Sequence, residues 1–243
     1  MGDDKKTATG KDLKYQELKR KNLTFSAFKQ KEPPTTQKEL WNHAVEYYFD
    51  EKYSDSIHVF QVNHVLSEII SMLDRELNPT ISGESPYLLG DLNIFTHGRV
   101  VYQGKKLVGT EYNLKFNTRD KNNWVSSEDL EKYLDDWIET SPGIRFNLQS
   151  IKNRLDSNST IWYRGCNIGK YKKILKLTRD MFWGIPKVCA YDLRARLSFE
   201  YDLPIRMKEI TGASVHLILP RKKGRKMLKE GTPEFNNHVI CVP

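Results

Sequence analysis

The sequence predicts an α+β fold, in which an antiparallel sheet packs with three or four helices behind a disordered basic N-terminal arm. Three observations lead to this prediction. The segment "YDLRARLSFEY" alternates apolar and polar residues, which is typical of a strand with one face in water. Other stretches repeat apolar residues every three to four positions, as amphipathic helices do. Residues 1–35 show neither period.

The N-terminal segment is expected to be a flexible basic arm over residues 1–35, followed by a single α+β domain over residues 36–243 with a basic C-terminal segment. The arm is rich in Lys, Thr and Gln and ends at the stiff pair Pro33 and Pro34. A segment with so few apolar residues cannot bury enough surface to offset the entropy of folding.

Two helices and one strand are expected in the first part of the domain. Thr36 and Glu39 have the spacing of a capping box, ahead of apolar residues that share one helical face. The segment "SIHVFQV" at 56–62 is predicted to be a short buried strand. Asn63 then precedes a second helix, which Pro79 ends. The apolar stripe of this helix consists of Leu66, Ile69, Ile70, Leu73 and Leu77.

The middle of the chain alternates between strand and helix patterns. The segment "GRVVYQGKKLVGTEYNLKF" predicts hairpin strands with Gly104 between them. Ser126 and Asp129 can cap the helix "SEDLEKYLDDWIE". Two further strands are predicted, at "GIRFNLQSI", which alternates from Ile144 to Leu148, and at "TIWY".

The last third is expected to hold one helix and the longest strand. The segment between Gly169 and Gly184 has apolar residues at helical spacing. Residues 191–201 are predicted to form one antiparallel strand, and "ASVHLIL" at 213–219 is expected to pair beside it.

The formal net charge is +8 and is unevenly distributed along the chain. Residues 1–38 carry a net charge of +5, residues 39–150 carry −8 and residues 151–243 carry +11. This polarity favours contact with polyanions at the basic part, and it favours head-to-tail self-association.

Two clusters of cations in the C-terminal third are the candidate binding residues for nucleic acid or anionic lipid. One is expected on the exposed face of the helix after Gly169, and the other follows a strand that stops at Pro220. If the fold brings them together, they would bind phosphates without reading sequence, because no recognition-helix or RNA-recognition motif is present. The first cluster is Lys170, Lys172, Lys173, Lys176 and Arg179, and the second is Arg221, Lys222, Lys223, Arg225, Lys226 and Lys229.

The second cluster contains "RKKGRK", which has the cation density that a nuclear-import receptor recognises. The same density serves RNA binding equally well, and a solvated surface loop is the third interpretation. The candidate import residues are Arg221, Lys222, Lys223, Arg225 and Lys226.

No motif predicts catalysis. The sequence has no phosphate-binding loop, dinucleotide fingerprint, nucleophile elbow or paired-histidine zinc motif, so no cofactor and no metal site are expected. His216 is interpreted as a histidine satisfied within a strand. Asp91, Glu111 and Lys115 are the candidates for a nuclease site, in which two carboxylates hold a hard cation and a lysine stabilises the attacked phosphate. The competing interpretation is that these three are ordinary surface charges.

The cysteines and the hydropathy predict an intracellular protein. Cys166, Cys189 and Cys241 are far apart and lack metal-ligand spacing, so three unpaired thiols are expected, as suits the cytosol or nucleus. No stretch approaches the ~18 apolar residues of a membrane span. Neither a secretory signal nor a lipid anchor is expected.

The order of elements resembles that of rhabdovirus matrix proteins, in which a Lys-rich arm precedes a compact α+β domain. The stretch "YNLKFNTRDKNNWVSSEDLEKYLDDWI" is similar to the early strand–helix unit of that family, and "LRARLSFEY" is similar to a long late strand. The basic cluster suits the plant-infecting members that assemble in the nucleus, whereas the P-P-x-Y motif common in animal members is missing. The resemblance implies a structural virion protein that condenses the ribonucleoprotein and ties it to an anionic membrane.

The leading expectation is a non-enzymatic, matrix-type viral protein that binds RNA or the viral nucleocapsid and an anionic membrane surface electrostatically, and that self-associates. A metal-dependent nuclease is one alternative. A regulatory or movement protein that binds RNA non-specifically, such as a silencing suppressor, is another. An import receptor is a further expected partner, and the expected location is the nucleus, the cytoplasm or the virion.

Overall fold

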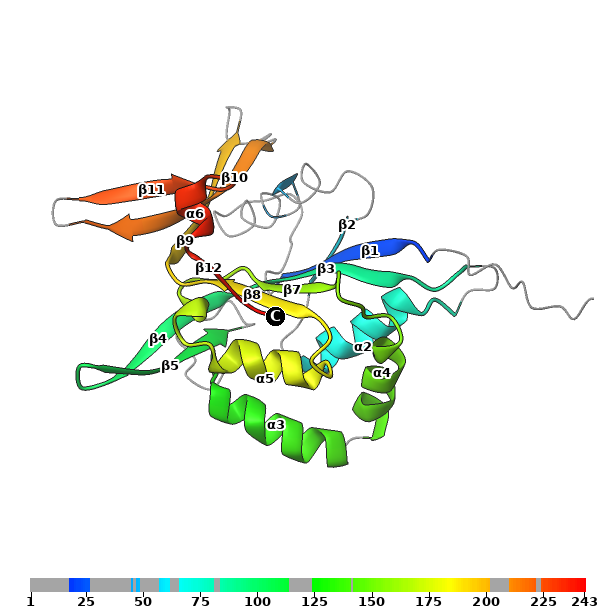
Figure 1. The fold of residues 1–243 in the computed structure, drawn as a ribbon. Helices are drawn as coiled ribbons and strands as arrows, with labels where there is room; N and C mark the ends of the chain where they lie inside the picture. Colours follow the sequence, from blue (N-terminus) through cyan, green and yellow to red (C-terminus); the bar gives the residue numbers. More distant parts are fainter. Residues whose placement is uncertain are drawn as a thin grey trace, which may run out of the picture.

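The computed structural model describes residues 18–26, 45, 47–48, 57–61, 66–80, 84–113, 124–140, 142–201, 210–221 and 224–243. Within them the chain forms a mixed fold of helices and strands, as expected (Figure 1). The helices are α2 (Leu66–Leu77), α3 (Ser127–Thr140), α4 (Pro142–Lys152), α5 (Lys173–Met181) and α6 (Pro233–Asn236), with a short 3-10 helix at Ile168–Lys170.

The largest sheet has six strands in the order β12-β8-β7-β3-β1-β2. Neighbours from β8 to β2 run parallel, and β12 is antiparallel to β8. The expectation of an antiparallel sheet is therefore wrong for this sheet, although it is correct for the two three-stranded sheets. The strands are β1 (Arg20–Ser26), β2 (Ile57–Gln61), β3 (Leu88–Phe95), β7 (Thr160–Tyr163), β8 (Lys187–Tyr191) and β12 (Val239–Val242).

Helices α2, α3, α4 and α5 cover one face of this sheet (Figure 1). Because side chains alternate along a strand, Ile161 and Tyr163 of β7 enter the core beneath these helices, and Ile174 of α5 packs into the same core. The hydroxyl of Tyr163 lies 2.8 Å from Thr178 Oγ1, which satisfies both groups inside the core.

The segment 143–151 is a correction, because it forms helix α4 rather than a strand. Pro142 stands at the first helical position, where its missing amide hydrogen is not needed. Leu148 and Ile151 are buried three residues apart, which brings them to one face of the helix. The short alternation from Ile144 to Leu148 therefore does not report a strand.

A three-stranded antiparallel sheet packs on the other side of the large sheet, against the carboxyl ends of β3 and β8, in the order β11-β10-β9. Its strands are β9 (Arg194–Tyr201), β10 (Ile210–Pro220) and β11 (Arg225–Lys229), and the expected pairing of 213–219 beside 194–201 is confirmed. Leu197, Val215, Leu217 and Leu228 pack in the second core together with Tyr191. This core joins the two sheets.

Residues 191–201 were expected to form one strand, and the structure divides them between two sheets. β8 ends at Tyr191, and β9 begins at Arg194 in the three-stranded sheet. Asp192 and Leu193 make the crossing, where the Asp192 amide donates to the His238 carbonyl and the Leu193 carbonyl accepts from the Asn167 amide. The apolar–polar alternation continues through this crossing, so the sequence pattern does not reveal it.

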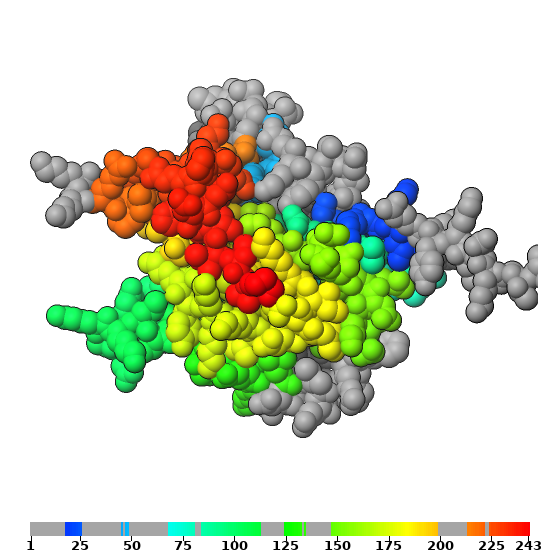
Figure 2. Space-filling view, viewed as in Figure 1, coloured from blue at the N-terminus to red at the C-terminus, as the bar shows by residue number. Residues whose placement is uncertain are grey.

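The remaining sheet consists of β4 (His97–Gln103), β5 (Lys106–Asn113) and β6 (Trp124–Val125). The expected hairpin is confirmed, with Gly104 at the turn in the left-handed region at φ +63°. The hairpins β4–β5 and β10–β11 project from the same side of the molecule, and the surface is recessed between them (Figures 1 and 2). The expected cap of α3 is also confirmed, since Ser126 Oγ accepts from the Asp129 amide at 3.1 Å.

Part of the expected flexible arm is an internal strand. Residues Arg20–Ser26 form β1, which lies between β2 and β3 in the large sheet. Leu23 and Phe25 are buried in the helical core. Residues 1–17 and 27–35 lie outside the described part of the chain, as do the capping residues Thr36 and Glu39.

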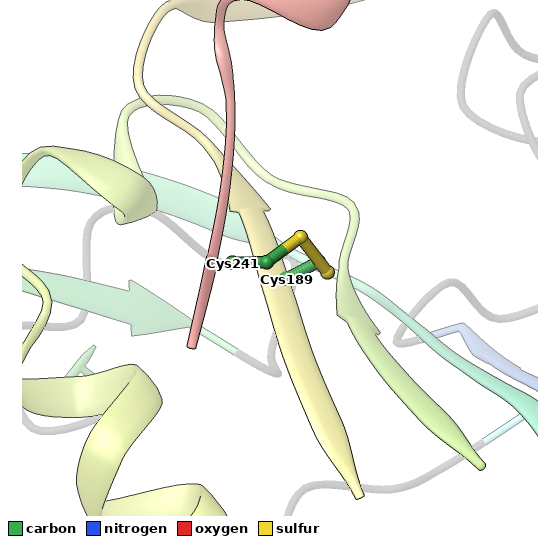
Figure 3. The surroundings of a disulfide bond; sticks show 2 residues. All are labelled: Cys189 and Cys241. Atoms are coloured by element: carbon green, nitrogen blue, oxygen red, sulfur yellow. A yellow bond between two sulfur atoms is a disulfide. The ribbon is translucent and has the colours of Figure 1, made fainter. Parts of the chain in front are cut away.

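Cys189 and Cys241 form a disulfide, which corrects the expectation of three unpaired thiols (Figure 3). The two residues are directly opposite each other on β8 and β12, with their Cα atoms 4.1 Å apart. Cys166 is the free cysteine. The disulfide removes the three unpaired thiols on which the expectation of a reducing compartment depended. None of the helices in the described ranges is long and apolar enough to span a bilayer.

Candidate anion-binding site

Three parallel strands end side by side, and the residues that follow them form the site. β3 ends at Phe95, β7 at Tyr163 and β8 at Tyr191. β7 lies between β3 and β8 and all three run in the same direction, so their carboxyl ends meet at one edge of the sheet. Ligand sites in open α/β sheets occur at this position.

Arg164 directly follows β7 and provides the central charge of the site. Its guanidinium carbon lies 4.2 Å from the centre of the Trp162 ring. Its Nη1 atom donates to the Tyr191 hydroxyl at 2.6 Å, and its Nε atom donates to Asn93 Oδ1 at 2.9 Å. The side chain is only 2% exposed. These contacts fix the plane and the position of a nearly buried cation.

Glu230 balances part of this charge, because its Oε1 atom lies 3.7 Å from Arg164 Nη1. The Tyr48 hydroxyl donates to the other carboxylate oxygen. Burial raises the pKa of both Tyr48 and Tyr191, so both phenols stay protonated at neutral pH. A cavity of about 590 Å³ lies beside this group, with Trp162 in its wall.

A pocket of about 340 Å³ lies on the other side of Arg164, between the carboxyl edge of the large sheet and the β9–β10–β11 sheet. No Asp or Glu of the described chain lines it. Three further arginines do, Arg194 and Arg196 from β9 and Arg225 from β11. None of these three has an ion-pair or hydrogen-bond partner for its side chain among the described residues. The pocket therefore combines one ordered guanidinium with three that have no acidic partner in the described part of the chain.

His97 and Cys166 complete the polar lining of this pocket. Burial lowers the pKa of His97, so its imidazole is neutral at pH 7 and adds no charge. Burial also raises the pKa of the Cys166 thiol, an effect that is opposed by the Ala195 carbonyl contact and by the charge of Arg194. The Cys166 Sγ atom donates to the Ala195 carbonyl at 3.3 Å.

Glycines allow the loop after β7 to pack closely against the start of β4. A Cβ atom on Gly98 would lie 2.1 Å from the Cys166 carbonyl oxygen. A Cβ atom on Gly165 would lie 2.8 Å from the Thr96 carbonyl oxygen. Such contacts are far shorter than van der Waals distance, so a side chain at either position would displace the wall of the pocket.

The β9–β10–β11 sheet turns a basic face away from the second core. We define the basic face as Arg194, Arg196, His216, Arg225 and Lys229. In the strand register His216 lies opposite both Arg196 and Lys229, so these three form a row across the sheet. The arginines and the lysine of this face are exposed.

The predicted cations of α5 lie on the opposite side of the large sheet from the basic face (Figure 1). Lys170, Lys172 and Lys176 are exposed. Lys173 Nζ lies 3.0 Å from Glu131 Oε2 on α3, and this hydrogen bond raises the pKa of Lys173. Arg179 is half-buried, with its guanidinium close to Gly184. The two predicted clusters are therefore not brought together.

The described members of the second predicted cluster lie in and before β11. Arg225, Lys226 and Lys229 belong to β11, and Arg221 is exposed directly after β10. Lys226 forms an ion pair with Glu234, which lowers the pKa of Glu234. Lys222 and Lys223 lie outside the described residues, so the import hypothesis stays a prediction.

The nuclease candidates lie on different sheets, Asp91 in β3 and Glu111 in β5, and Lys115 is outside the described residues. Glu111 forms an ion pair with Arg99. Across the described ranges no three His, Cys, Asp or Glu side chains are grouped as metal ligands. His216 Nδ1 lies 3.4 Å from Ser214 Oγ, within its own strand.

Arg164, Arg194 and Arg196 are site residues that the sequence analysis did not select. Arg194 and Arg196 were read only as the wet side of a strand, and Arg164 was not considered. A signal was available in "TIWYRGCNIG", where a short apolar strand is followed at once by a cation and a glycine. Residues directly after a parallel strand are where ligand sites of open α/β sheets are found.

Comparisons of the chain with protein-family models, with curated proteins and with solved structures found no match.

Proposed function

We propose that this chain is a non-enzymatic protein that binds RNA or ribonucleoprotein through backbone phosphates, and that the basic face of the β9–β10–β11 sheet makes the contact. The observation that carries the proposal is the row Arg196, His216 and Lys229, with Arg194 and Arg225 beside it. Their exposed guanidinium and ammonium groups are not neutralised by acidic partners among the described residues.

The dimensions of the row suit a single strand. Neighbouring strands lie about 4.8 Å apart, so Arg196 and Lys229 are separated by roughly 10 Å across β10. A row of this length can contact neighbouring phosphates of one strand. Contacts of this kind give affinity and salt dependence without sequence preference. Of the matrix-type role, we propose only the electrostatic binding of RNA or ribonucleoprotein by this surface.

The test is a salt series of binding to a labelled single-stranded RNA with a 5′-hydroxyl end. Each lost phosphate contact flattens the log–log slope by about 0.7, so Arg196→Gln with Lys229→Gln flattens it by about 1.4. At 1 M salt the electrostatic contribution vanishes, so the wild type and the variant bind equally there. A slope that is flatter by about 1.4 then makes the variant's affinity roughly 25-fold lower at 0.1 M salt, one decade below. The matched control, Lys172→Gln with Lys176→Gln, removes two exposed cations, one directly before α5 and one within it, and should leave the slope unchanged. Equal effects of the two pairs would refute the assignment.

An anionic membrane is the second candidate ligand for the same face. Met227 is 46% exposed, and it lies opposite Ile218, which in turn lies opposite Arg194. An apolar pair among cations is typical of a peripheral membrane contact, in which each cation adds on the order of 1 kcal/mol. Met227→Gln should weaken co-sedimentation with phosphatidylserine vesicles and leave RNA affinity unchanged. If vesicle binding is insensitive to this change, the membrane candidate fails.

A further inference from the structure

We propose that the pocket at the carboxyl edge of the large sheet binds a short chain of phosphate groups, such as the 5′-triphosphate of an RNA or of a free nucleoside triphosphate. The inference rests on the proposed function, since it names the chemical group that one part of the same surface recognises. It concerns the concave part of this surface, which shares Arg194, Arg196 and Arg225 with the basic face.

The charge of the pocket selects the class of ligand. Arg194, Arg196 and Arg225 have no acidic partners among the described residues, whereas the charge of Arg164 is partly balanced by Glu230. Within the described ranges, the pocket therefore presents three positive charges without an acidic partner and a fourth that is partly balanced. A single phosphate diester carries one negative charge and would leave most of this unmatched. A terminal chain of phosphates carries several negative charges in a small volume, which matches the pocket better.

The shape of the pocket supports the same ligand. Its volume of about 340 Å³ lies at the lower end of the range for small-molecule sites. Phe95 and Tyr191 line it but are buried in the second core, so they offer little surface on which a base could stack. Guanidinium forks suit oxygen-rich, doubly accepting groups. The phosphates are therefore the part of the ligand that enters.

The geometry of Arg164 makes this a built site rather than a chance gathering of arginines. Its guanidinium is held by Trp162, Tyr191 and Asn93 before any ligand arrives. Ordering this side chain in advance removes an entropic cost that a flexible surface arginine would bring to binding. The exposed Arg194, Arg196 and Arg225 can then close over the anion.

Cys166 supplies a reporter for occupancy of this pocket alone. It lines the pocket and is the free thiol, because the other two cysteines are joined in the disulfide. The assay measures the rate at which a maleimide alkylates Cys166 at pH 8, in the full chain without reductant. The added probes are inorganic tripolyphosphate, a nucleoside triphosphate, and one RNA prepared with either a 5′-triphosphate or a 5′-hydroxyl end. The expected result is protection by the first two and by the triphosphate RNA, with at least about tenfold weaker protection by the 5′-hydroxyl RNA. If only the triphosphate RNA protects Cys166, the phosphate chain that the pocket binds is an RNA end. If only the nucleoside triphosphate protects it, the ligand is the free nucleotide.

Two variants compare a cation that the pocket shares with the basic face and a cation that belongs to the basic face alone. Arg194→Gln should raise the tripolyphosphate concentration needed for half-protection by about tenfold, the effect of losing one charge-assisted contact. Lys229→Gln removes a cation of the basic face that does not line the pocket, and it should leave this concentration within about twofold. Equal effects of the two variants, equal protection by both RNA forms, or no protection by any probe would overturn the inference. If the 5′-hydroxyl RNA still binds with a steep salt slope, the proposed function survives that outcome. If it does not bind but tripolyphosphate protects Cys166, only the proposed function falls.

Discussion

Reduction of the Cys189–Cys241 disulfide is expected to destabilise the protein strongly, because the bond closes a long loop. The two cysteines are 52 residues apart, and the loop contains the entire β9–β10–β11 sheet and α6. In the oxidised chain this loop stays closed after unfolding, so the unfolded state has less entropy to gain. Reduction removes this restriction while leaving the native strand pairing of β8 with β12 available.

The size of the effect follows from the sequence separation. The chain-entropy relation for a loop of 52 residues gives about 4 kcal/mol at 25 °C. With a urea m-value of about 2–3 kcal/mol/M, the unfolding midpoint should fall by roughly 1.4–2 M. The m-value itself should rise, because the reduced unfolded chain is less compact and exposes more surface.

The assay is urea denaturation followed by tryptophan fluorescence, with and without a reductant, on the same preparation. The Cys241→Ala variant in the absence of reductant should reproduce the reduced midpoint, and Cys166→Ala should match the oxidised one. A reduced midpoint within about 0.3 M of the oxidised value would refute the loop-closure reasoning, since that shift corresponds to less than about 1 kcal/mol.

Three further expectations concern elements of the fold. Leu23→Ala in β1 should lower the free energy of unfolding by about 2–5 kcal/mol in urea denaturation, because it leaves a cavity in the core, whereas a residue of a flexible arm would show no change. Ser126→Ala removes the cap of α3 and should cost about 1 kcal/mol in the same assay, an expectation that a change below about 0.3 kcal/mol contradicts. The hydrogen bond from Arg20 lowers the pKa of Asp156, so this contact stabilises the fold above the unfolded pKa of about 3.9 and is lost as the pH falls through the lower folded value. Asp156→Asn should therefore lower the urea midpoint at pH 7 but not at about pH 2, and an equal loss at both values would exclude this linkage.

Elements whose signal is local could be predicted from the sequence. The stripe of α2 produced a helix over Leu66–Leu77, and the cap at Ser126 placed the start of α3. The β4–β5 hairpin followed from alternating residues around Gly104. In each case one face of the element is polar, so the spacing of apolar residues in the sequence indicates the type of element.

The parallel sheet could not be predicted in this way, because its strands are covered on both faces. β3 reads "LLGDLNIF", and nearly every side chain in it is buried, so no alternation remains. β1 lies in a segment whose Lys and Thr residues suggest disorder, yet Leu23 and Phe25 suffice to place it in the core. Composition alone cannot predict such a strand, because its few apolar residues are surrounded by charged ones.

The candidate site was missed for the same reason. Its residues come from the ends of β3, β7 and β8 and from β9 and β11, and parallel topology is what brings them together. Charge counting selected the C-terminal third, including Arg225 and Lys229, which belong to the basic face. It could not show that the α5 lysines lie across the sheet from them, because one-dimensional charge density carries no information about faces (Figure 1).

The interior position of β1 has a practical consequence for anyone who shortens this protein. A fragment that starts at residue 36, the boundary that composition suggests, would lack the strand between β2 and β3 and leave two unsatisfied edges in the middle of the sheet. Such a fragment is expected to aggregate or to recruit a foreign strand into the gap. Trimming for crystallisation or affinity tagging should therefore stop before residue 18.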